Sequence, residues 1–325
     1  MKANKTFFLL LIAAFSFTSC QKDLDVLVVD PVLGPDSTWY DAISPSMPVV
    51  GLKNSLLLDI HQDSFIMNTT ATAFTASSGL QLLFTPASLL TSAGMPALGE
   101  IKVESYLLKK KGDMIRMGTP TTSDGKVLVS GGELYVRLLK DGAELQVSQN
   151  SHVNISYADT GLSSQMELFY GDATNSSGFN WLPNADSSNF VIPTTVQTYQ
   201  LLTNRLHWIN CDYFYDTSNA FQTTVSAVLP SNYTNANTIA YIVFSDIRSV
   251  IAMNGNSFTR KFSSGKLPVN KSITMVIISK QGDNYFLGHQ QAITTGTPGA
   301  ISVQEITVTP VITSANDIKT YLDSL

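Results

Sequence analysis

The sequence predicts an all-β protein of two antiparallel β-sandwich domains, joined by a loop-rich segment and followed by a short C-terminal helix. From about residue 50, short runs rich in Val, Ile, Thr, Tyr and Phe alternate with clusters of Gly, Asn, Asp and Ser, as strands alternate with turns. No helical pattern intervenes, which argues against a parallel α/β sheet. The chain has 325 residues, 44% of them hydrophobic and 14% charged, enough for one large or two medium cores.

The first sandwich is expected over residues 50–158. Its clearest local feature is Asp141-Gly142, because this pair readily adopts the positive φ values of a two-residue hairpin turn. The lysine run 109–111 precedes a Gly-Asp pair and is expected at a solvated hairpin end. Strands are predicted at Leu56–Ile60, Gly79–Phe84, Glu100–Leu108, Lys126–Val129, Glu133–Leu139 and Glu144–Val147.

Residues 159–215 are expected to form the loop-rich connecting segment, because they are rich in Gly, Ser and Asn. The second sandwich is expected over residues 216–313, with a turn at Gln281–Asn284. Its strands are predicted at Phe221–Leu229, Thr238–Phe244, Ser257–Phe262, Ser272–Ile278, Tyr285–Leu287 and Ile301–Val308.

Residues 314–325 are predicted to form a helix. Ser314 is the expected N-cap, and Asp317 stands at the third helical position. A helix this short needs a surface to pack against. The apolar residues expected to face that surface are Ile318, Tyr321, Leu322 and Leu325.

The N-terminus has the pattern of a signal peptide over residues 1–19. Lys2 and Lys5 are followed by an apolar run at 7–17, and two small residues precede Cys20. Eleven apolar residues are too few to cross a bilayer, which takes roughly 20. Export is therefore expected, with Cys20 as the first residue of the mature chain.

The segment Phe17-Thr18-Ser19-Cys20 resembles the lipobox of bacterial lipoproteins, with Phe and Ser at positions that usually hold an aliphatic and a smaller residue. The resemblance implies lipidation of Cys20 and a partner membrane. The next segment, Gln21–Asp25, resembles the acidic export signal of Bacteroidetes-type surface lipoproteins. It implies an outer-membrane location facing the cell exterior; an ordinary polar tether is the alternative interpretation.

Residues 20–49 are expected to form the lipidated cysteine and an extended tether, because several Pro and Gly residues interrupt any periodicity. Trp39 and Tyr40 are the exception within this tether. We expect these two aromatic residues to pack on the first sandwich, with a ligand platform as the alternative.

Two stretches resemble a family. Residues 79–90, continuing to 136, resemble a ZU5-like β-sandwich module of uncharacterised Bacteroidetes-type surface lipoproteins. The segment Leu206–Phe214, with its Trp-Ile-Asn-Cys-Asp core, is similar to a segment of the same proteins. The resemblance implies a module used for protein interaction or domain coupling, and fold alone does not fix function.

Several classes of function lack their sequence signals. The net charge of −5 gives no electrostatic footprint for nucleic acid. Glycine-rich nucleotide loops and the serine-hydrolase elbow are absent, and the spacing of the four histidines (61, 152, 207 and 289) matches no common zinc motif. We therefore expect no cofactor, no dedicated metal site and no enzyme activity.

Cys211 is the only cysteine left once Cys20 is lipidated, so the mature chain cannot form an internal disulfide. His207 lies four residues before it and could lower the pKa of its thiol if a turn or bulge brought the two together. The alternative is an inert thiol packed among aromatic residues.

Four residues are candidates for ligand binding: Trp181, Trp208, Asn210 and Asp212. Each has a structural alternative, because tryptophans fill cores and Asn and Asp cap turns. The leading functional hypothesis is a non-catalytic module that binds an envelope component. The alternatives are a glycan-binding accessory protein, a fimbrial or other assembly subunit, and a hydrolase with dispersed acidic residues.

Overall fold

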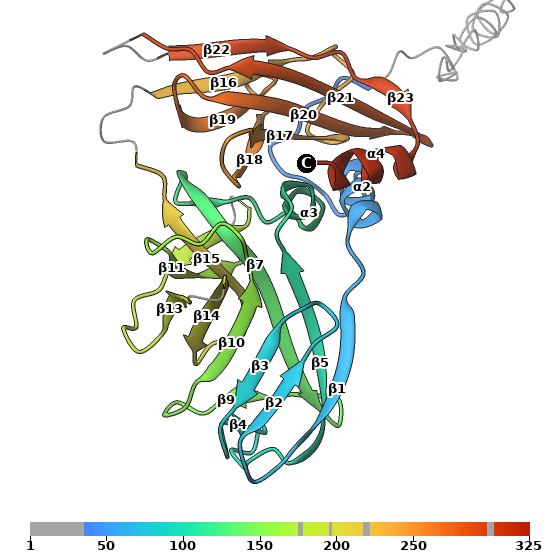
Figure 1. Cartoon of the computed structure of the whole chain (residues 1–325). Coiled ribbons are helices and arrows are strands. Elements are labelled where there is room, and N and C mark those ends of the chain that lie inside the picture. The colour runs from blue at the N-terminus through green and yellow to red at the C-terminus, as the bar shows by residue number, and fades with distance from the viewer. Residues whose placement is uncertain (1–35, 175–177, 195–196, 217–221, 298–301) are drawn as a thin grey trace, which may run out of the picture. The chain divides into compact units, whose positions relative to one another are not determined.

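The structure is a computed structural model that describes residues 36–174, 178–194, 197–216, 222–297 and 302–325 (Figure 1). Strands hold 51% of the residues and helices 9%, which confirms the predicted all-β class. Residues Ser37–Leu325 form one compact unit. The expected signal peptide, Cys20 and most of the tether lie outside the described residues.

Two antiparallel sheets enclose the first core. The first sheet has the order β1-β5-β7-β15-β11-β12, with β6 and β8 also paired to β7, and the second sheet has the order β13-β14-β10-β3-β2; β4 and β9 form a separate pair. The strands are β1 (His61–Met67), β2 (Thr72–Thr75), β3 (Gln81–Phe84), β4 (Leu89–Leu90), β5 (Gly99–Leu108), β6 (Thr122–Ser123), β7 (Lys126–Lys140), β8 (Ala143–Glu144), β9 (Gln146–Val147), β10 (Val153–Ala158), β11 (Glu167–Asp172), β12 (Asn180–Pro183), β13 (Phe190–Pro193), β14 (Thr198–Thr203) and β15 (His207–Phe214).

Alternation along the strands builds this core. On β10, Val153, Ile155 and Tyr157 are buried while the residues between them are half-buried, and β14 repeats the pattern. From the first sheet, Leu134 and Val136 join the same core. Each fully buried apolar side chain of this size contributes roughly 1.5–3 kcal/mol, so the register of every strand is strongly specified.

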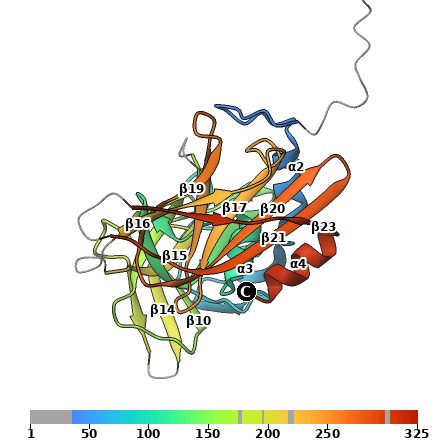
Figure 2. The same ribbon diagram turned by 90° about the horizontal axis from the view of Figure 1, so that it is seen from above.

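The third sheet has the order β22-β16-β19-β18-β17-β20-β21-β23 and folds around a second core (Figures 1 and 2). Among the described strand pairs of this sheet, only β16–β22 is parallel. Every residue of the central strand β17 is buried, which explains its continuous apolar run. The strands are β16 (Gln222–Val228), β17 (Thr238–Phe244), β18 (Val250–Asn256), β19 (Lys261–Pro268), β20 (Ser272–Gln281), β21 (Asn284–Ile293), β22 (Ser302–Thr307) and β23 (Val311–Thr313).

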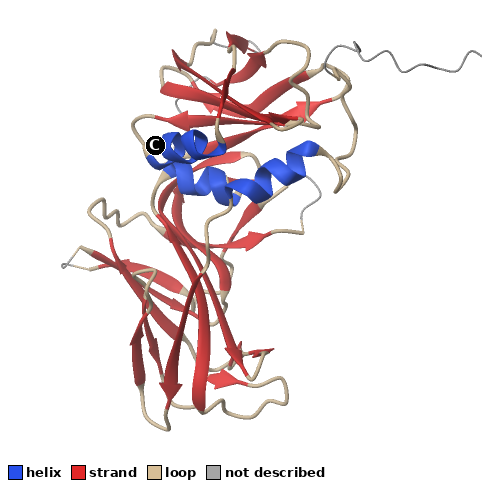
Figure 3. Ribbon diagram, turned by 90° about the vertical axis from the view of Figure 1, so that its right-hand side faces the viewer, coloured by secondary structure: helices blue, strands red, loops and turns tan. Residues whose placement is uncertain are grey.

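Three helices gather at the other face of β17 and β20 (Figure 3): α2 (Pro48–Leu56), α3 (Lys111–Met117) and α4 (Ala315–Asp323). The predicted C-terminal helix is confirmed in detail. Ser314 and Asp317 form a reciprocal capping box, and Ile318 and Leu322 are buried. Docking on the sheet supplies the stability that nine helical residues lack alone.

Two short turns are also confirmed. Lys140 pairs with Ala143 across Asp141-Gly142, whose φ angles are 51° and 80°. The predicted turn at Gln281–Asn284 joins β20 to β21.

Helix α2 corrects two predictions. Pro48 and Val49 were expected to end the tether, and Leu56–Ile60 to form a strand. Instead, Pro48 begins the helix, where its missing N–H costs nothing. The buried residues Val49, Leu52 and Leu56 follow helical spacing, a pattern that the prolines and the single glycine around it obscured.

The lysine run at 109–111 does not end a hairpin; it begins α3. Lys111 Nζ donates to the carbonyl of Phe244 at 2.6 Å, and Lys110 Nζ donates to the carbonyl of Asp323 at 3.3 Å. Gly112 allows the contact with α4, because a Cβ there would lie 1.8 Å from the carbonyl oxygen of Leu322. The lysines therefore join α3 to β17 and α4.

Residues 159–215 are not a loop-rich connection. They contain β11–β15, whose strands complete the first and second sheets. Gly161, Gly178, Asn184, Asn189 and Asn204 lie between these short strands, and a composition rich in such residues predicts a loop. Ser257–Phe262 was expected to be a strand, but only Lys261 and Phe262 belong to one, at the start of β19. Residues 257–260 form the turn between β18 and β19, with Arg260 at φ 53°.

Trp39 and Tyr40 pack on the third sheet, where the prediction placed them on the first sandwich. Trp39 contacts Phe262 of β19, with ring centroids 5.0 Å apart. The backbone of Tyr40 exchanges two hydrogen bonds with the Asn235 side chain, at 3.0 and 2.6 Å. We call residues 37–41 the N-terminal strap.

Candidate functional site

Three aromatic residues lie in register across three neighbouring strands of the first sheet. Tyr106 of β5 pairs with Tyr135 of β7, which pairs with Trp208 of β15. Their strand neighbours Ser105, Val136 and Ile209 are buried in the core, so by alternation the three rings lie on the outer face. We call Tyr106, Tyr135 and Trp208 the aromatic ladder.

The rings of the ladder form a half-buried aromatic cluster on this face. The Tyr106 and Trp208 rings are parallel within 4°, with centroids 6.1 Å apart, and Tyr135 lies tilted 5.2 Å from Trp208. All three side chains retain partial exposure. The Tyr106 hydroxyl donates to the carbonyl of Leu58 at 3.0 Å, which fixes this end of the ladder.

A second aromatic layer supports Trp208. Phe179 and Trp181 lie edge-on to it, at centroid distances of 6.0 and 6.5 Å. This packing requires a glycine at position 171, since a Cβ there would lie 2.6 Å from both Phe179 and the Trp208 Cβ. Trp208 is therefore held by the packing beneath it.

Four charged or titratable side chains run beside the ladder: Glu104, Arg137, Glu144 and His207. We call them the charged row. Arg137 donates to Glu144 at 2.9 Å and to Glu104 at 3.2 Å, and His207 Nε2 lies 2.6 Å from Glu144. The Arg137 side chain is 37% exposed and that of His207 54%, so the row is open to solvent.

At neutral pH this face presents both hydrogen-bond donors, the tyrosine hydroxyls, and an acceptor, the Glu144 carboxylate. Burial, followed by the charge of Asp59, raises the pKa of Tyr106. Burial likewise raises the pKa of Tyr135, so both phenols stay protonated. Burial alone would raise the pKa of Glu144, but hydrogen bonds from Arg137 and His207 lower it and keep the group a carboxylate.

The structure separates the four predicted ligand-binding residues. Trp208 belongs to the aromatic ladder. Trp181 lies beneath it and is fully buried, and Asn210 and Asp212 are also fully buried. Cys20, the predicted lipidation site, lies outside the described residues.

Asn210 and Asp212 belong to a buried polar cluster with Thr119, Ser130 and Glu133. Thr119 donates to Glu133 at 2.5 Å, Ser130 to Asn210 at 3.2 Å, and Asn210 to Asp212 at 2.7 Å. Burial raises the pKa of Glu133 well above its ordinary range and that of Asp212 to about 8. Burial therefore favours the protonated form of both acids, which act in packing rather than as solvent-facing carboxylates.

His207 and Cys211 do not form a dyad. Cys211 is buried in the first core, whereas His207 is exposed, has a φ of 71° and contacts Glu144. Burial raises the pKa of the Cys211 thiol, which is the opposite of activation. The packed, inert alternative is the one that the structure supports.

Sequence reasoning missed Tyr106 and Tyr135. Neither stands in a motif, and their proximity to Trp208 depends on the register of three strands.

Within the described ranges, no three His, Cys, Asp or Glu side chains are arranged to hold a metal ion. None of the helices in the described residues is long and apolar enough to cross a membrane. No protein-family model and no curated protein matches the chain.

Proposed function

We propose that the protein is a lipid-anchored binding module on the outer face of the outer membrane, not an enzyme, and that it binds a glycan through the aromatic ladder. The signal peptide, the lipobox-like segment ending at Cys20 and the acidic segment after it support the location. The ZU5-like resemblance of residues 79–136 is part of the same proposal, because it agrees with a binding role.

The parallel Tyr106 and Trp208 rings carry the glycan assignment. A sugar ring presents C–H groups on its flat faces and hydroxyls at its edge, so it packs on an aromatic plane without losing its polar contacts. Aromatic side chains that are apolar on the face and polar at the tip suit such a ligand. The Tyr106 and Trp208 ring centroids lie 6.1 Å apart, close enough for one sugar residue to contact both side chains.

The charged row supplies the polar half of the site. Arg137 and His207 are donors, and Glu104 and Glu144 are acceptors. A ligand lying across the ladder would reach both kinds of group at its edge. A few directed polar groups beside an apolar surface are typical of sites that orient a small ligand.

A broad panel of neutral and acidic glycans, probed with the full-length protein in detergent, tests this proposal. We expect binding that quenches or shifts tryptophan fluorescence. Trp208→Ala and Tyr135→Ala should each weaken it by about 0.5–1.5 kcal/mol, roughly 2- to 12-fold in Kd. Phe190→Ala is the matched control, since this aromatic residue is 40% exposed on the second sheet.

Two outcomes would contradict the glycan assignment: no signal on the whole panel, or equal binding by the ladder variants and the parent. Recovery of a stoichiometric protein partner by cross-linking in cells would instead favour an envelope-interaction or assembly role. A turnover activity of the purified protein would remove the non-catalytic part of the proposal.

The anchor has its own test. Cys20→Ser should move the protein from the membrane fraction to the soluble fraction, because the acyl chains supply the membrane affinity. Surface proteolysis of intact cells checks which way the anchored protein faces. A Cys20→Ser protein that stays in the membrane fraction would contradict lipid anchoring.

A further inference from the structure

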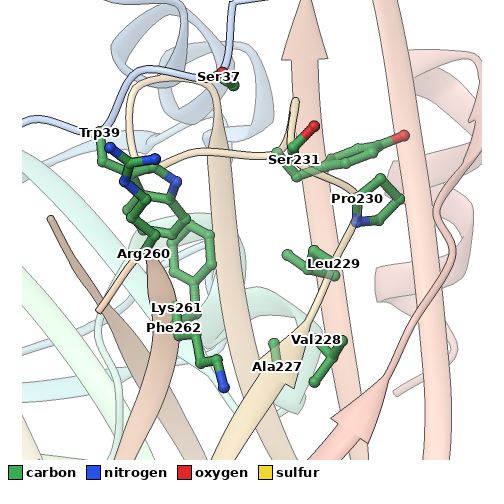
Figure 4. Close-up of a pocket in the computed structure, with 11 residues that line it drawn as sticks. Ser37, Trp39, Ala227, Val228, Leu229, Pro230, Ser231, Arg260, Lys261 and Phe262 are labelled. Atoms are coloured by element: carbon green, nitrogen blue, oxygen red, sulfur yellow. The ribbon is translucent and has the colours of Figure 1, made fainter. Parts of the chain in front are cut away.

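A pocket of about 220 Å³ lies on the third sheet, away from the ladder residues. Figure 4 shows Trp39, Arg260 and Phe262 along one side and Val228, Leu229 and Pro230 along the other. The N-terminal strap, the end of β16 and the turn before β19 therefore each contribute a wall. Ser37 and Ser231 add hydroxyls.

The aromatic wall of the pocket is preformed. Trp39 packs on Phe262, and Gly255 beneath leaves the space that Trp39 needs, since a Cβ there would lie 3.1 Å from the indole. The two hydrogen bonds between Tyr40 and Asn235 hold the strap in place. A ligand would therefore meet a fixed indole, with little ordering cost.

The turn that carries Arg260 is also fixed. The Asn256 side chain accepts from Thr259 N at 2.8 Å, and the Asn256 carbonyl accepts from Arg260 N at 2.8 Å. Arg260 takes a left-handed φ of 53°, a conformation that non-glycine residues adopt at a cost. These hydrogen bonds fix the backbone of the turn that carries Arg260 to the pocket.

Among the described residues, one positive charge of the pocket has no acidic partner. Lys261 is neutralised by Glu305, and Asp41 accepts a hydrogen bond from Ser257. Arg260 makes no ion pair with any acidic side chain in the part of the chain that the structure describes. A guanidinium is a fork of donors that matches a carboxylate in two parallel hydrogen bonds.

We propose that this pocket binds a carboxylated sugar residue, with its ring against Trp39 and its carboxylate on Arg260. The volume holds about seven waters at about 30 Å³ each, which suits a single sugar residue. Arg260, which has no ion-pair partner within the described ranges, matches a single carboxylate, whereas a phosphate monoester carries about 1.5–2 negative charges. This site is separate from the aromatic ladder and does not depend on what the ladder binds.

The walls of the pocket argue against a peptide. A peptide that adds to a sheet needs a strand edge with free backbone groups. In this wall, however, β16 is already paired on both sides, with Ala227 opposite Phe262 of β19 and Val228 opposite Thr307 of β22. The exposed groups are side chains, as a small ligand requires.

Titration calorimetry of the full-length protein with methyl glucuronide and methyl glucoside tests the proposal, because the two ligands differ only in the carboxylate. We expect the glucuronide to bind at least ten-fold more tightly. Arg260→Gln should remove that preference. Lys266→Ala is the matched control, because it removes an exposed cation from β19, six residues and about 20 Å along the chain from Arg260.

Each other result overturns the assignment. Equal binding of the two glycosides removes the role of the carboxylate, and acetate binding as tightly as the glucuronide reduces the pocket to a plain anion site. Binding that survives Arg260→Gln but is lost in Trp208→Ala would move the acidic sugar to the aromatic ladder. Absence of glucuronide binding by a folded protein removes the site, whatever the ladder binds.

Discussion

Asn210 donates a 2.7 Å hydrogen bond to Asp212 from the same strand, and this short contact sits at a β-bulge. The register of β15 against β7 shifts between these two residues. Alternation along β15 places both side chains in the buried polar cluster, where Asp212 Oδ1 and Glu133 Oε1 have no hydrogen-bond partner in the described structure. A protonated carboxyl group is the form that such a site tolerates.

Protein stability should therefore fall as pH rises. Burial holds the pKa of Asp212 at about 8, against 3.8 for the exposed group. Because the folded protein binds this proton more tightly than the unfolded chain, the contribution of Asp212 to the free energy of unfolding is complete below a pH of about 4. It is lost as the pH rises toward 8. Urea unfolding across this range should show a slope approaching 1.4 kcal/mol per pH unit.

Asp212→Asn should flatten this slope, because the amide cannot ionise. Asp283→Asn, on the exposed turn between β20 and β21, should leave the slope unchanged. An Asp212→Asn protein with the parent slope would show that this acid does not control the pH dependence.

The packing beneath the aromatic ladder gives a second prediction. Gly171→Ala places a methyl group 2.6 Å from Phe179 and from the Trp208 Cβ, and overpacking of this kind costs about 1–3 kcal/mol. We expect a lower free energy of unfolding, a shifted tryptophan emission and weaker glycan binding.

The matched control for that variant is Gly51→Ala. Gly51 lies within helix α2, and a Cβ there meets nothing within 4 Å. Alanine in place of glycine should then stabilise the helix by roughly 0.5–1 kcal/mol. Equal effects of the two substitutions would mean that Gly171 is not a packing position.

Local chemistry made part of this fold predictable. Asp141-Gly142 and the Ser314–Asp317 capping box act within a few residues, so the sequence alone specifies them. The strand at Thr238–Phe244 matches β17 residue for residue, because burial on both faces leaves an uninterrupted apolar run.

Other elements depend on partners that are distant in sequence. Lysines at the start of helix α3 donate hydrogen bonds to the carbonyls of Phe244 and Asp323. Without knowledge of these distant partners, the lysine run predicts a solvated turn. The aromatic ladder depends on the register of three strands, so Trp208 was identifiable as a candidate while Tyr106 and Tyr135 were not. The burial of Trp181 likewise depends on distant contacts, because Phe179 packs against its ring and Gly171 leaves room for Phe179.

The capping box of α4 should contribute measurably to stability. Ser314 accepts from Asp317 N at 3.1 Å and donates to the Asp317 carboxylate at 2.7 Å. Ser314→Ala removes both contacts and should lower the free energy of unfolding by about 1 kcal/mol. Thr320→Ala, at an exposed position of the same helix, is the control and should be neutral or slightly stabilising. A neutral Ser314→Ala would contradict this role.

Cys211 should be unreactive until the protein unfolds. Its thiol is buried in the first core, and burial raises its pKa, so the thiolate that reacts with disulfide reagents is scarce and shielded. In a Cys20→Ser chain, where Cys211 is the sole thiol, we expect labelling only at the rate of unfolding and complete labelling in urea. His207→Ala should not change the native rate, because the His207 side chain contacts Glu144. Rapid labelling of the folded chain that slows on His207→Ala would restore the dyad.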